Sequence, residues 1–340
     1  MSNELKLGLA LGYWGPTPPT NLISSVVEAE KLGYDSAWTA ESYGSDALTP
    51  LAYVASHTNK IKLGTSVVQL SARTPTATAM AALTLDHLSN GRFVLGLGVS
   101  GPQVVEGWYG QPFPKPLART REYVDVIRQV LRREGPVTND GPHYPLPLGG
   151  DHTTGLGKPL KAITYPLRAD IPIYMGAEGP KNIALSAEIA DGWLPLFYSP
   201  YREEVYADSL VNAKPDFEIA QLIPCNINDD LEAALAPVKA FLALYVGGMG
   251  AKEQNFHNAL MSRMGFAKEA EEIQDLYLAG NKAAAAEKVP DEFADEISLC
   301  GPIDRIRDRL DAWRESRVTT LLIANQDEST IRTMAELVLS

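Results

Sequence analysis

The stretch Leu63-Gly-Thr-Ser-Val-Val-Gln-Leu70 is an apolar run that ends in small and polar residues just before the Ala- and Leu-rich helical pattern of 76–88. The same succession recurs at Gly96-Leu-Gly-Val-Ser-Gly101 and at Met175-Gly-Ala-Glu-Gly-Pro-Lys-Asn182. In a parallel βα barrel the carboxyl ends of all strands meet at one rim, where helix N-termini present backbone N–H groups to an anion. The three segments therefore predict an α/β protein of the (β/α)8 TIM-barrel class with an anion-binding rim.

Outward from these segments, strand-like and helix-like patterns alternate along the whole chain. The apolar runs predict eight strands, at residues 5–12, 36–41, 61–70, 93–100, 171–177, 193–198, 217–226 and 319–324. Two stretches interrupt the alternation, the Gly- and Pro-rich 135–170 and the mainly helical 230–296, and we expect both to be insertions over the C-terminal mouth of the barrel. No linker divides the chain, so we expect residues 1–340 to form a single domain.

Composition narrows the classes of partner. The chain of 340 residues carries a net charge of −12 and has no basic run, which disfavours a nucleic-acid partner. No segment resembles a signal peptide or a span of about 18 apolar residues, so we expect a cytoplasmic protein with no membrane partner. An anionic ligand must then be met locally, by helix N-termini and by basic side chains such as Arg73 or Lys181.

Two glycine motifs admit more than one interpretation. Gly96-x-Gly98-x-x-Gly101 matches the dinucleotide fingerprint, but its glycines lie inside a strand and Pro102 follows at once. We interpret these glycines as relief of crowding in a barrel strand, with Val99 and Ser100 offering amides to a phosphate. In the second motif, 176–182, Pro180 suits a first helical turn and Gly179 would allow close approach of a ligand. Helix initiation alone explains that pattern equally well.

Polar and aromatic side chains follow several predicted strands and should converge on the barrel mouth. Glu41 is notable because a carboxylate that ends a buried strand must find partners or shift its pKa. An acid/base role and a structural hydrogen-bonding role are both open for it. The five histidines have no metal-ligand spacing, so we expect no metal site.

With these segments in place, the chain resembles the luciferase-like monooxygenase superfamily, and within it the actinobacterial coenzyme F420-dependent oxidoreductases. The resemblance rests on 63–67, on Gly91-Arg-Phe-Val-Leu-Gly-Leu-Gly98 and on 176–182 with Ala190-Asp-Gly-Trp193. It implies a deazaflavin or flavin ring in the barrel mouth, supported by a cis peptide bond at Ser66-Val67. The cofactor contacts that it implies are Glu41, Ser66, Val67, Gln69, Val99, Ser100, Ala177, Glu178, Gly179, Lys181 and Asn182.

The chain also departs from relatives in that family. The sugar-phosphate dehydrogenases place a His directly after the strand-two acid and a Glu after strand four, where this chain has Ser42 and Gly101. Their alcohol-oxidising mechanism and their substrate therefore do not carry over. For proton handling we propose Glu41 or Tyr43 instead.

The function that follows is hydride transfer between C5 of coenzyme F420 and a small organic substrate that the sequence does not identify. One alternative is a monooxygenase that uses FMN, and a second is a flavin- or deazaflavin-binding protein without catalytic activity. The resemblance also makes a homodimer an expectation.

Overall fold

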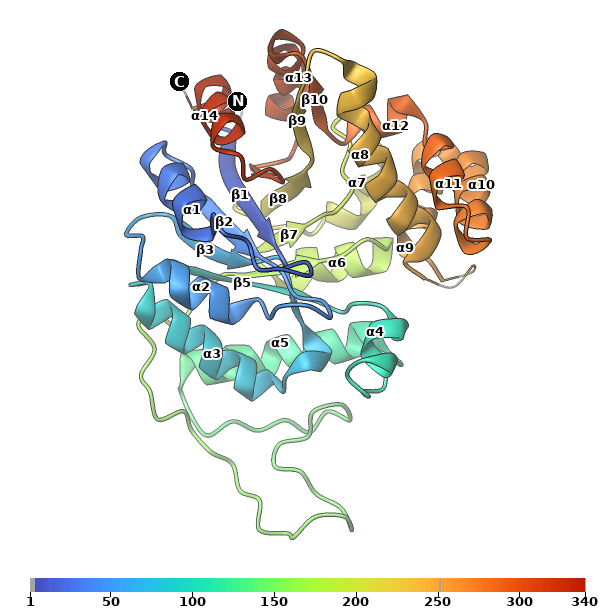
Figure 1. Cartoon of the computed structure of the whole chain (residues 1–340). Helices are drawn as coiled ribbons and strands as arrows, with labels where there is room; N and C mark the ends of the chain where they lie inside the picture. Colours follow the sequence, from blue (N-terminus) through green and yellow to red (C-terminus); the bar gives the residue numbers. More distant parts are fainter. Residues whose placement is uncertain (1–3, 251, 253, 340) are drawn as a thin grey trace. The chain divides into compact units, whose positions relative to one another are not determined.

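The computed structural model describes residues 4–250, 252 and 254–339, and it divides into two compact units. The first unit comprises Met1–Leu11, Thr20–Trp38 and Gly176–Ser340, and the second comprises Gly12–Pro19 and Thr39–Met175. Figure 1 labels the elements. All paired strands in the sheet are parallel where the register is defined, and the strand order β3-β2-β1-β11-β8-β7-β6-β5 is closed by pairing of β3 with β5. The fold is a TIM barrel, as the sequence predicted.

The first unit contains five barrel strands and most of the helices. Its barrel strands are β1 (Lys6–Gly12), β2 (Ser36–Thr39), β7 (Gly192–Leu194), β8 (Glu218–Ile223) and β11 (Thr320–Ile323). A separate parallel pair, β9 (Cys225–Ile227) and β10 (Leu299–Gly301), was not predicted as a pair. The helices are α1 (Leu22–Lys31), α6 (Pro180–Ile189), α7 (Glu204–Ala207), α8 (Leu231–Ala243), α9 (Phe256–Met261), α10 (Ala267–Leu278), α11 (Lys282–Glu287), α12 (Asp291–Glu296), α13 (Ile303–Glu315) and α14 (Glu328–Val338).

The second unit holds the segments on which the fold prediction rests. Its strands are β3 (Lys62–Thr65), β4 (Val68–Gln69), β5 (Phe93–Gly98) and β6 (Ile173–Gly176). Its helices are α2 (Leu48–Ala55), α3 (Pro75–Leu88), α4 (Pro102–Gly107) and α5 (Pro116–Arg132). All six residues of β5 are buried, as expected of a strand covered on both faces by side chains of the barrel and its helices.

The insertion 230–296 is helical, as predicted, and its Gly-rich break has a packing cause. A Cβ at Gly247 would lie 2.5 Å from Tyr277 Cβ, and one at Gly248 would lie 2.4 Å from Tyr277 Cε1. The Tyr277 ring of α10 therefore occupies the space that side chains at these two positions would need. The expectation that no segment reaches the length and composition of a membrane span was wrong for one stretch here: Leu231–Gly248 is long and apolar enough by composition, and 39% of it is buried. It packs against α10, α11 and α12, and helices that form the core of water-soluble domains meet the same criterion.

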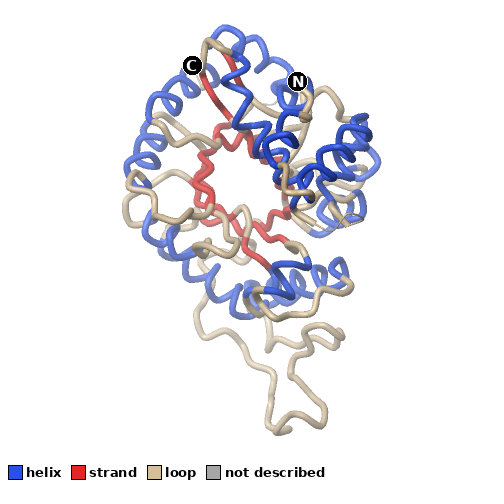
Figure 2. Tube along the Cα trace, turned by 45° about the vertical axis from the view of Figure 1, so that its right-hand side comes forward, coloured by secondary structure: helices blue, strands red, loops and turns tan. Residues whose placement is uncertain are grey.

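The segment 135–170 is an extended loop that projects away from the helices of its unit (Figure 2). Glu122 of α5 accepts hydrogen bonds from the backbone N–H groups of His143 and Tyr144, at 3.0 and 3.2 Å. An antiparallel bridge between Asn139 and Leu146 encloses these two residues, so this part of the loop is a small hairpin.

Between β3 and β5 the pairing contains one extra residue. Leu63 pairs with Phe93 and Gly64 with Val94, whereas Val68 pairs with Leu97 and Gln69 with Gly98. The segment from 64 to 68 thus spans four steps against three on β5, which defines a bulge. The Ser66-Val67 peptide in this bulge is cis, in agreement with the family resemblance.

The bulge explains why residue 98 is glycine. A Cβ at Gly98 would lie 2.4 Å from Val67 Cγ2, so the Val67 side chain fills the space that any larger residue would need. We predict that Gly98→Ala lowers the free energy of unfolding by about 1–3 kcal/mol through overpacking. Denaturant titration measures this loss.

The matched control is the double variant Gly98→Ala/Val67→Ala, which removes the methyl group that obstructs the new Cβ. We expect the double variant to lose less free energy of unfolding than the sum of the losses of Gly98→Ala and Val67→Ala, since the two residues are in contact. Strict additivity, or an unaltered stability of Gly98→Ala, would contradict the packing described.

Candidate cofactor site

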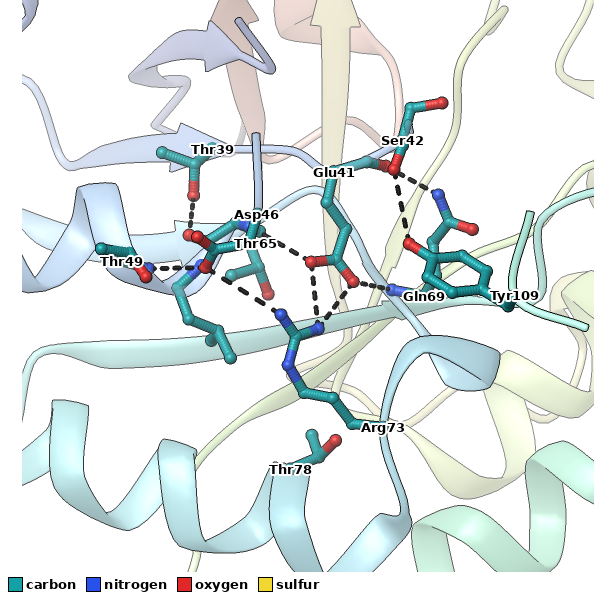
Figure 3. Close-up of polar contacts among 12 residues, drawn as sticks. Thr39, Glu41, Ser42, Asp46, Thr49, Thr65, Gln69, Arg73, Thr78 and Tyr109 are labelled. Atoms are coloured by element: carbon teal, nitrogen blue, oxygen red, sulfur yellow. Dashed lines mark hydrogen bonds and ion pairs between the residues drawn. The ribbon is translucent and has the colours of Figure 1, made fainter. Parts of the chain in front are cut away.

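The carboxylate of Glu41 lies at the centre of a hydrogen-bond network in the second unit, just beyond β2 (Figure 3). Its Oε1 accepts from the backbone N–H of Gln69 and from Arg73 Nη1, both at 2.8 Å. Its Oε2 accepts from Arg73 Nη1 at 3.0 Å and from the backbone N–H of Ala47 at 3.2 Å. Both oxygens are therefore occupied, and the residue is only 7% exposed. These contacts favour the structural role that the sequence left open beside the acid/base role.

This network also fixes the orientation of the Gln69 side chain. Its Nε2 donates to the Glu41 carbonyl oxygen at 3.0 Å, and because that oxygen can only accept, the orientation of the amide is fixed. The other end of the amide, Oε1, is buried and has no hydrogen-bond partner in the structure. A buried acceptor without a partner is costly, which makes Gln69 Oε1 a candidate ligand contact.

Arg73 has a different role from the one expected. The sequence suggested it as a free cation for an anionic cofactor, but its guanidinium is paired with Glu41 and lies 3.9 Å from Asp46. Its backbone carbonyl accepts from the Tyr123 hydroxyl of α5 at 3.1 Å. Burial opposes the charge of Arg73, but the hydrogen bond and attraction from Glu41 outweigh it and raise its pKa. Arg73 thus neutralises Glu41 and is not free to bind a phosphate.

Aromatic side chains lie at the edge of the same unit. Tyr43 is 64% exposed, and its ring centroid lies 6.4 Å from that of Trp108, which follows α4 and is equally exposed. The Tyr109 hydroxyl donates to the Ser42 carbonyl at 3.4 Å, and burial is the main cause of its raised pKa. Sequence reasoning placed Tyr43 here but missed Trp108 and Tyr109, because α4 is a short helix without a clear apolar period.

Val99 and Ser100 follow β5 in this unit, and both are half-buried. Ser100 has φ of +59°, a left-handed conformation that is uncommon for a residue with a side chain. Such conformations concentrate at ligand-binding sites. Ser66, Val67 and Gln69 lie in the bulge and β4 of the same unit. The predicted cofactor residues up to 100 therefore belong to one unit, and residues 177–182 belong to the other.

In the first unit, Gly179 is the residue that precedes α6. Its φ of −80° suits any residue, and a Cβ built on it would meet nothing within 4 Å. Neither backbone conformation nor packing requires a glycine, so the position leaves open space in front of the helix N-terminus. The first N–H groups of an α-helix have no intrahelical partner and attract anions. Lys181, in the first turn, is exposed.

Glu178 precedes this turn and is largely neutral at neutral pH. Its Oε1 accepts from the backbone N–H of Leu196 at 2.8 Å, whereas its Oε2 is buried and has no partner. Burial raises the pKa of Glu178 to about 8, against the opposing effects of the Leu196 hydrogen bond and of Arg263. A protonated carboxyl can donate a hydrogen bond, and it does not repel an anion. Asn182 Oδ1, one turn further, is likewise buried without a partner.

Two residues of the helical insertion were missed by the sequence analysis. Arg263 is exposed and donates to the Glu178 carbonyl at 3.0 Å, so it brings a positive charge to the 177–182 loop. His257 packs edge-on against Phe197, with ring centroids 5.4 Å apart, and burial lowers its pKa to about 4. The only available signal was that a long insertion is often functional, which does not single out a residue.

Comparisons with known proteins show which proteins this chain is similar to. The chain is 56% identical over 347 residues to a Mycobacterium tuberculosis protein named "Putative coenzyme F420-dependent oxidoreductase", an alignment that covers 99% of this chain and 100% of the relative. It is 28% identical to the 5,10-methylenetetrahydromethanopterin reductase of Archaeoglobus fulgidus, with 86% of each chain covered. Among solved structures it is similar to the coenzyme F420-dependent tetrahydromethanopterin reductase of Methanopyrus kandleri, with a TM-score of 0.80, 25% identity and 99% coverage of both chains.

The family itself is shown by a match over most of the chain. The profile of the luciferase-like monooxygenase family matches residues 8–320 and so includes the Glu41 network, the bulge and the 177–182 loop. The chain belongs to the luciferase-like monooxygenase family.

Proposed function

We propose that this protein is a coenzyme F420-dependent oxidoreductase that transfers a hydride between the deazaflavin and a small organic substrate. The observation that carries the proposal is the 56% identity, over the whole chain, to a relative named for this coenzyme. The methanopterin reductases at 28 and 25% identity are also named for reduction, and one of them is named for dependence on F420.

The residues present fit such a coenzyme. Gln69 Oε1, Glu178 Oε2 and Asn182 Oδ1 are buried and lack partners, so each can take up a ligand contact without losing an existing hydrogen bond. Gly179 leaves the N-terminus of α6 open, and Lys181 and Arg263 bring positive charge to the same loop. In this proposal Val99, Ser100 and the loop Ala177–Asn182 hold the phosphate-bearing part, and Ser66, Val67 and Gln69 support the ring.

When bound, the deazaflavin would donate or accept a hydride, which carries two electrons. The protein supplies orientation: Glu41 holds the Gln69 backbone and amide in place, and Arg73 neutralises Glu41, so the carboxylate is stable in a buried position. Because both oxygens of Glu41 accept hydrogen bonds, we assign it a positioning role and keep Tyr43 as the proton-handling candidate. The Tyr43 side chain is exposed to solvent.

The first experiment is a titration of the purified protein with F420 and, in parallel, with FMN. We expect F420 to bind more tightly and Gly179→Leu to weaken its binding at least tenfold, which corresponds to about 1.4 kcal/mol. The leucine would fill the open space before α6. Fluorescence of the coenzyme reports the Kd of each variant.

The matched control is Gly135→Leu, since a Cβ at Gly135 also meets nothing within 4 Å and this position lies outside the site. It should leave the Kd unchanged. Equal affinity of the wild type and Gly179→Leu would refute the assigned phosphate loop. Tighter binding of FMN, with oxygen consumed during turnover, would favour the monooxygenase alternative. Tight F420 binding without turnover on any carbonyl, enone or imine acceptor would favour a non-catalytic binding protein.

The second experiment concerns the protonation of Glu178 and needs no coenzyme. A glutamate in an unfolded chain has a pKa of about 4.3, and burial raises that of Glu178 to about 8. The folded protein therefore binds a proton that the unfolded chain has lost, and stability falls as pH rises from about 4.5 to 8. We predict that Glu178→Gln removes this dependence, so that its stability relative to wild type increases by up to about 1.4 kcal/mol per pH unit.

Denaturant titrations of both proteins between pH 5 and pH 8 measure the difference. Glu178→Asp serves as the control that keeps an ionisable group and should retain a pH-dependent loss of stability. Parallel pH profiles for wild type and Glu178→Gln would mean that Glu178 is ionised in the folded protein, and the neutral donor assigned to it would be wrong.

A further inference from the structure

The carboxyl group of Glu178 has a defined orientation, which decides where a proton on it must lie. Its Oε1 accepts a hydrogen bond from the backbone N–H of Leu196 at 2.8 Å. The Leu196 peptide is itself held in place, because its carbonyl accepts from Gln221 Nε2 at 3.1 Å and Gln221 of β8 is fully buried. Oε1 is therefore occupied as an acceptor, and a proton on this carboxyl group resides on Oε2.

The second oxygen of this carboxyl group, Oε2, is buried and has no hydrogen-bond partner in the part of the chain that the structure describes. A negative charge on it would lack any compensating donor, and a buried charge without partners is costly. The neutral form instead leaves Oε2 with an O–H group that is available as a donor. Burial raises the pKa of Glu178 to about 8, in agreement with a protonated carboxyl group at neutral pH.

The charged and titratable groups around Glu178 favour an anion beside the carboxyl group. Arg263 of the helical insertion is exposed and donates to the Glu178 backbone carbonyl at 3.0 Å. Lys181, in the first turn of α6, is exposed as well. On α7, burial raises the pKa of Tyr206 and keeps its hydroxyl neutral, and Glu204 is exposed to solvent. Two cations thus lie at the loop, and the charge of Glu204 is screened by water.

The residue after Glu178 leaves room for an acceptor. A Cβ built on Gly179 meets nothing within 4 Å, and α6 begins at the next residue. The first N–H groups of a helix have no intrahelical partner, so an anion bound there is met by several donors. A phosphate oxygen is a strong acceptor, and the proposed function places the phosphate of the coenzyme at this point.

We propose that Glu178 binds the coenzyme phosphate as a neutral acid, with its Oε2–H group donating a hydrogen bond to a phosphate oxygen. The inference rests on the proposed function, because it concerns the same loop. When the carboxyl group ionises, the donor is lost and the carboxylate places a negative charge next to the phosphate. Coenzyme affinity therefore depends on a proton that the protein carries, so it is retained while Glu178 is protonated and falls as the pH rises.

The test is a titration of the full chain with F420 at pH 7, 8 and 9. For a ligand that binds only the protonated form, the apparent Kd rises by the factor by which the protonated fraction falls. With a pKa of about 8, the wild-type Kd should rise about tenfold between pH 7 and pH 9. We expect the Kd of Glu178→Gln to stay constant over this range. Its amide offers an acceptor to the Leu196 N–H and an N–H donor in place of Oε2 at every pH.

Two further variants separate the proton of Glu178 from other effects. Glu178→Leu has no donor, so its Kd should be at least tenfold above that of the wild type at pH 7 and should not change with pH. Glu204→Gln removes the charge of the exposed glutamate on α7 and should keep the wild-type pH dependence. Every protein is titrated with the same coenzyme, so protonation of the coenzyme itself cancels in the comparison.

Proton uptake is a second measurement, which needs no variant. Calorimetric titration in two buffers of different ionisation enthalpy counts the protons that binding takes up. We expect about 0.9 proton per coenzyme at pH 9 and about 0.1 at pH 7. A wild-type Kd that is constant from pH 7 to pH 9, or an equal rise in Glu178→Gln, would overturn the inference and leave the coenzyme assignment intact. Absence of F420 binding at every pH would refute the proposed function and this inference with it.

Discussion

The site of the second unit depends on one buried carboxylate. Glu41 is almost fully removed from water, and a charge in such a position is stable only when its oxygens are hydrogen-bonded and its charge is balanced. Four hydrogen bonds and one arginine meet this requirement. The donors come from the segment after β2 and from β4 and the turn that follows it, so satisfying the carboxylate fixes these two segments relative to each other. The same network fixes the orientation of the Gln69 amide, because its Nε2 donates to the Glu41 carbonyl oxygen. In this orientation the amide oxygen, Oε1, has no hydrogen-bond partner.

The sequence was sufficient where one physical rule decides the outcome. The eight apolar runs predicted the barrel because a strand buried on both faces is nearly all apolar, and β5 is the clearest case. For Gly98 the interpretation as relief of crowding is confirmed, since a Cβ at this position would lie 2.4 Å from Val67 Cγ2. The cis peptide at Ser66-Val67 was predicted by family resemblance alone, because no local pattern in the sequence specifies it.

The rest could not be predicted because it depends on contacts between distant segments. Arg73 appeared to be a free cation until its distance to Glu41 was known, and Arg263 gives no sign in the sequence that it reaches Glu178. Burial raises the pKa of Glu178 and keeps it largely neutral. The sequence alone does not indicate whether a polar residue that follows a strand is buried. The course of the loop 135–170 is set by hydrogen bonds to α5 and α3, which its Gly- and Pro-rich composition does not specify.

The central claim is that loops of this barrel bind coenzyme F420 with the phosphate at the N-terminus of α6 and the ring beside Gln69. The most direct test is a crystal structure of the protein in complex with F420. The account predicts a phosphate in contact with the backbone of Gly179 and Lys181 and a ring in contact with the Gln69 amide. A coenzyme bound elsewhere, or a Gln69 Oε1 that remains without a partner in the complex, would contradict it.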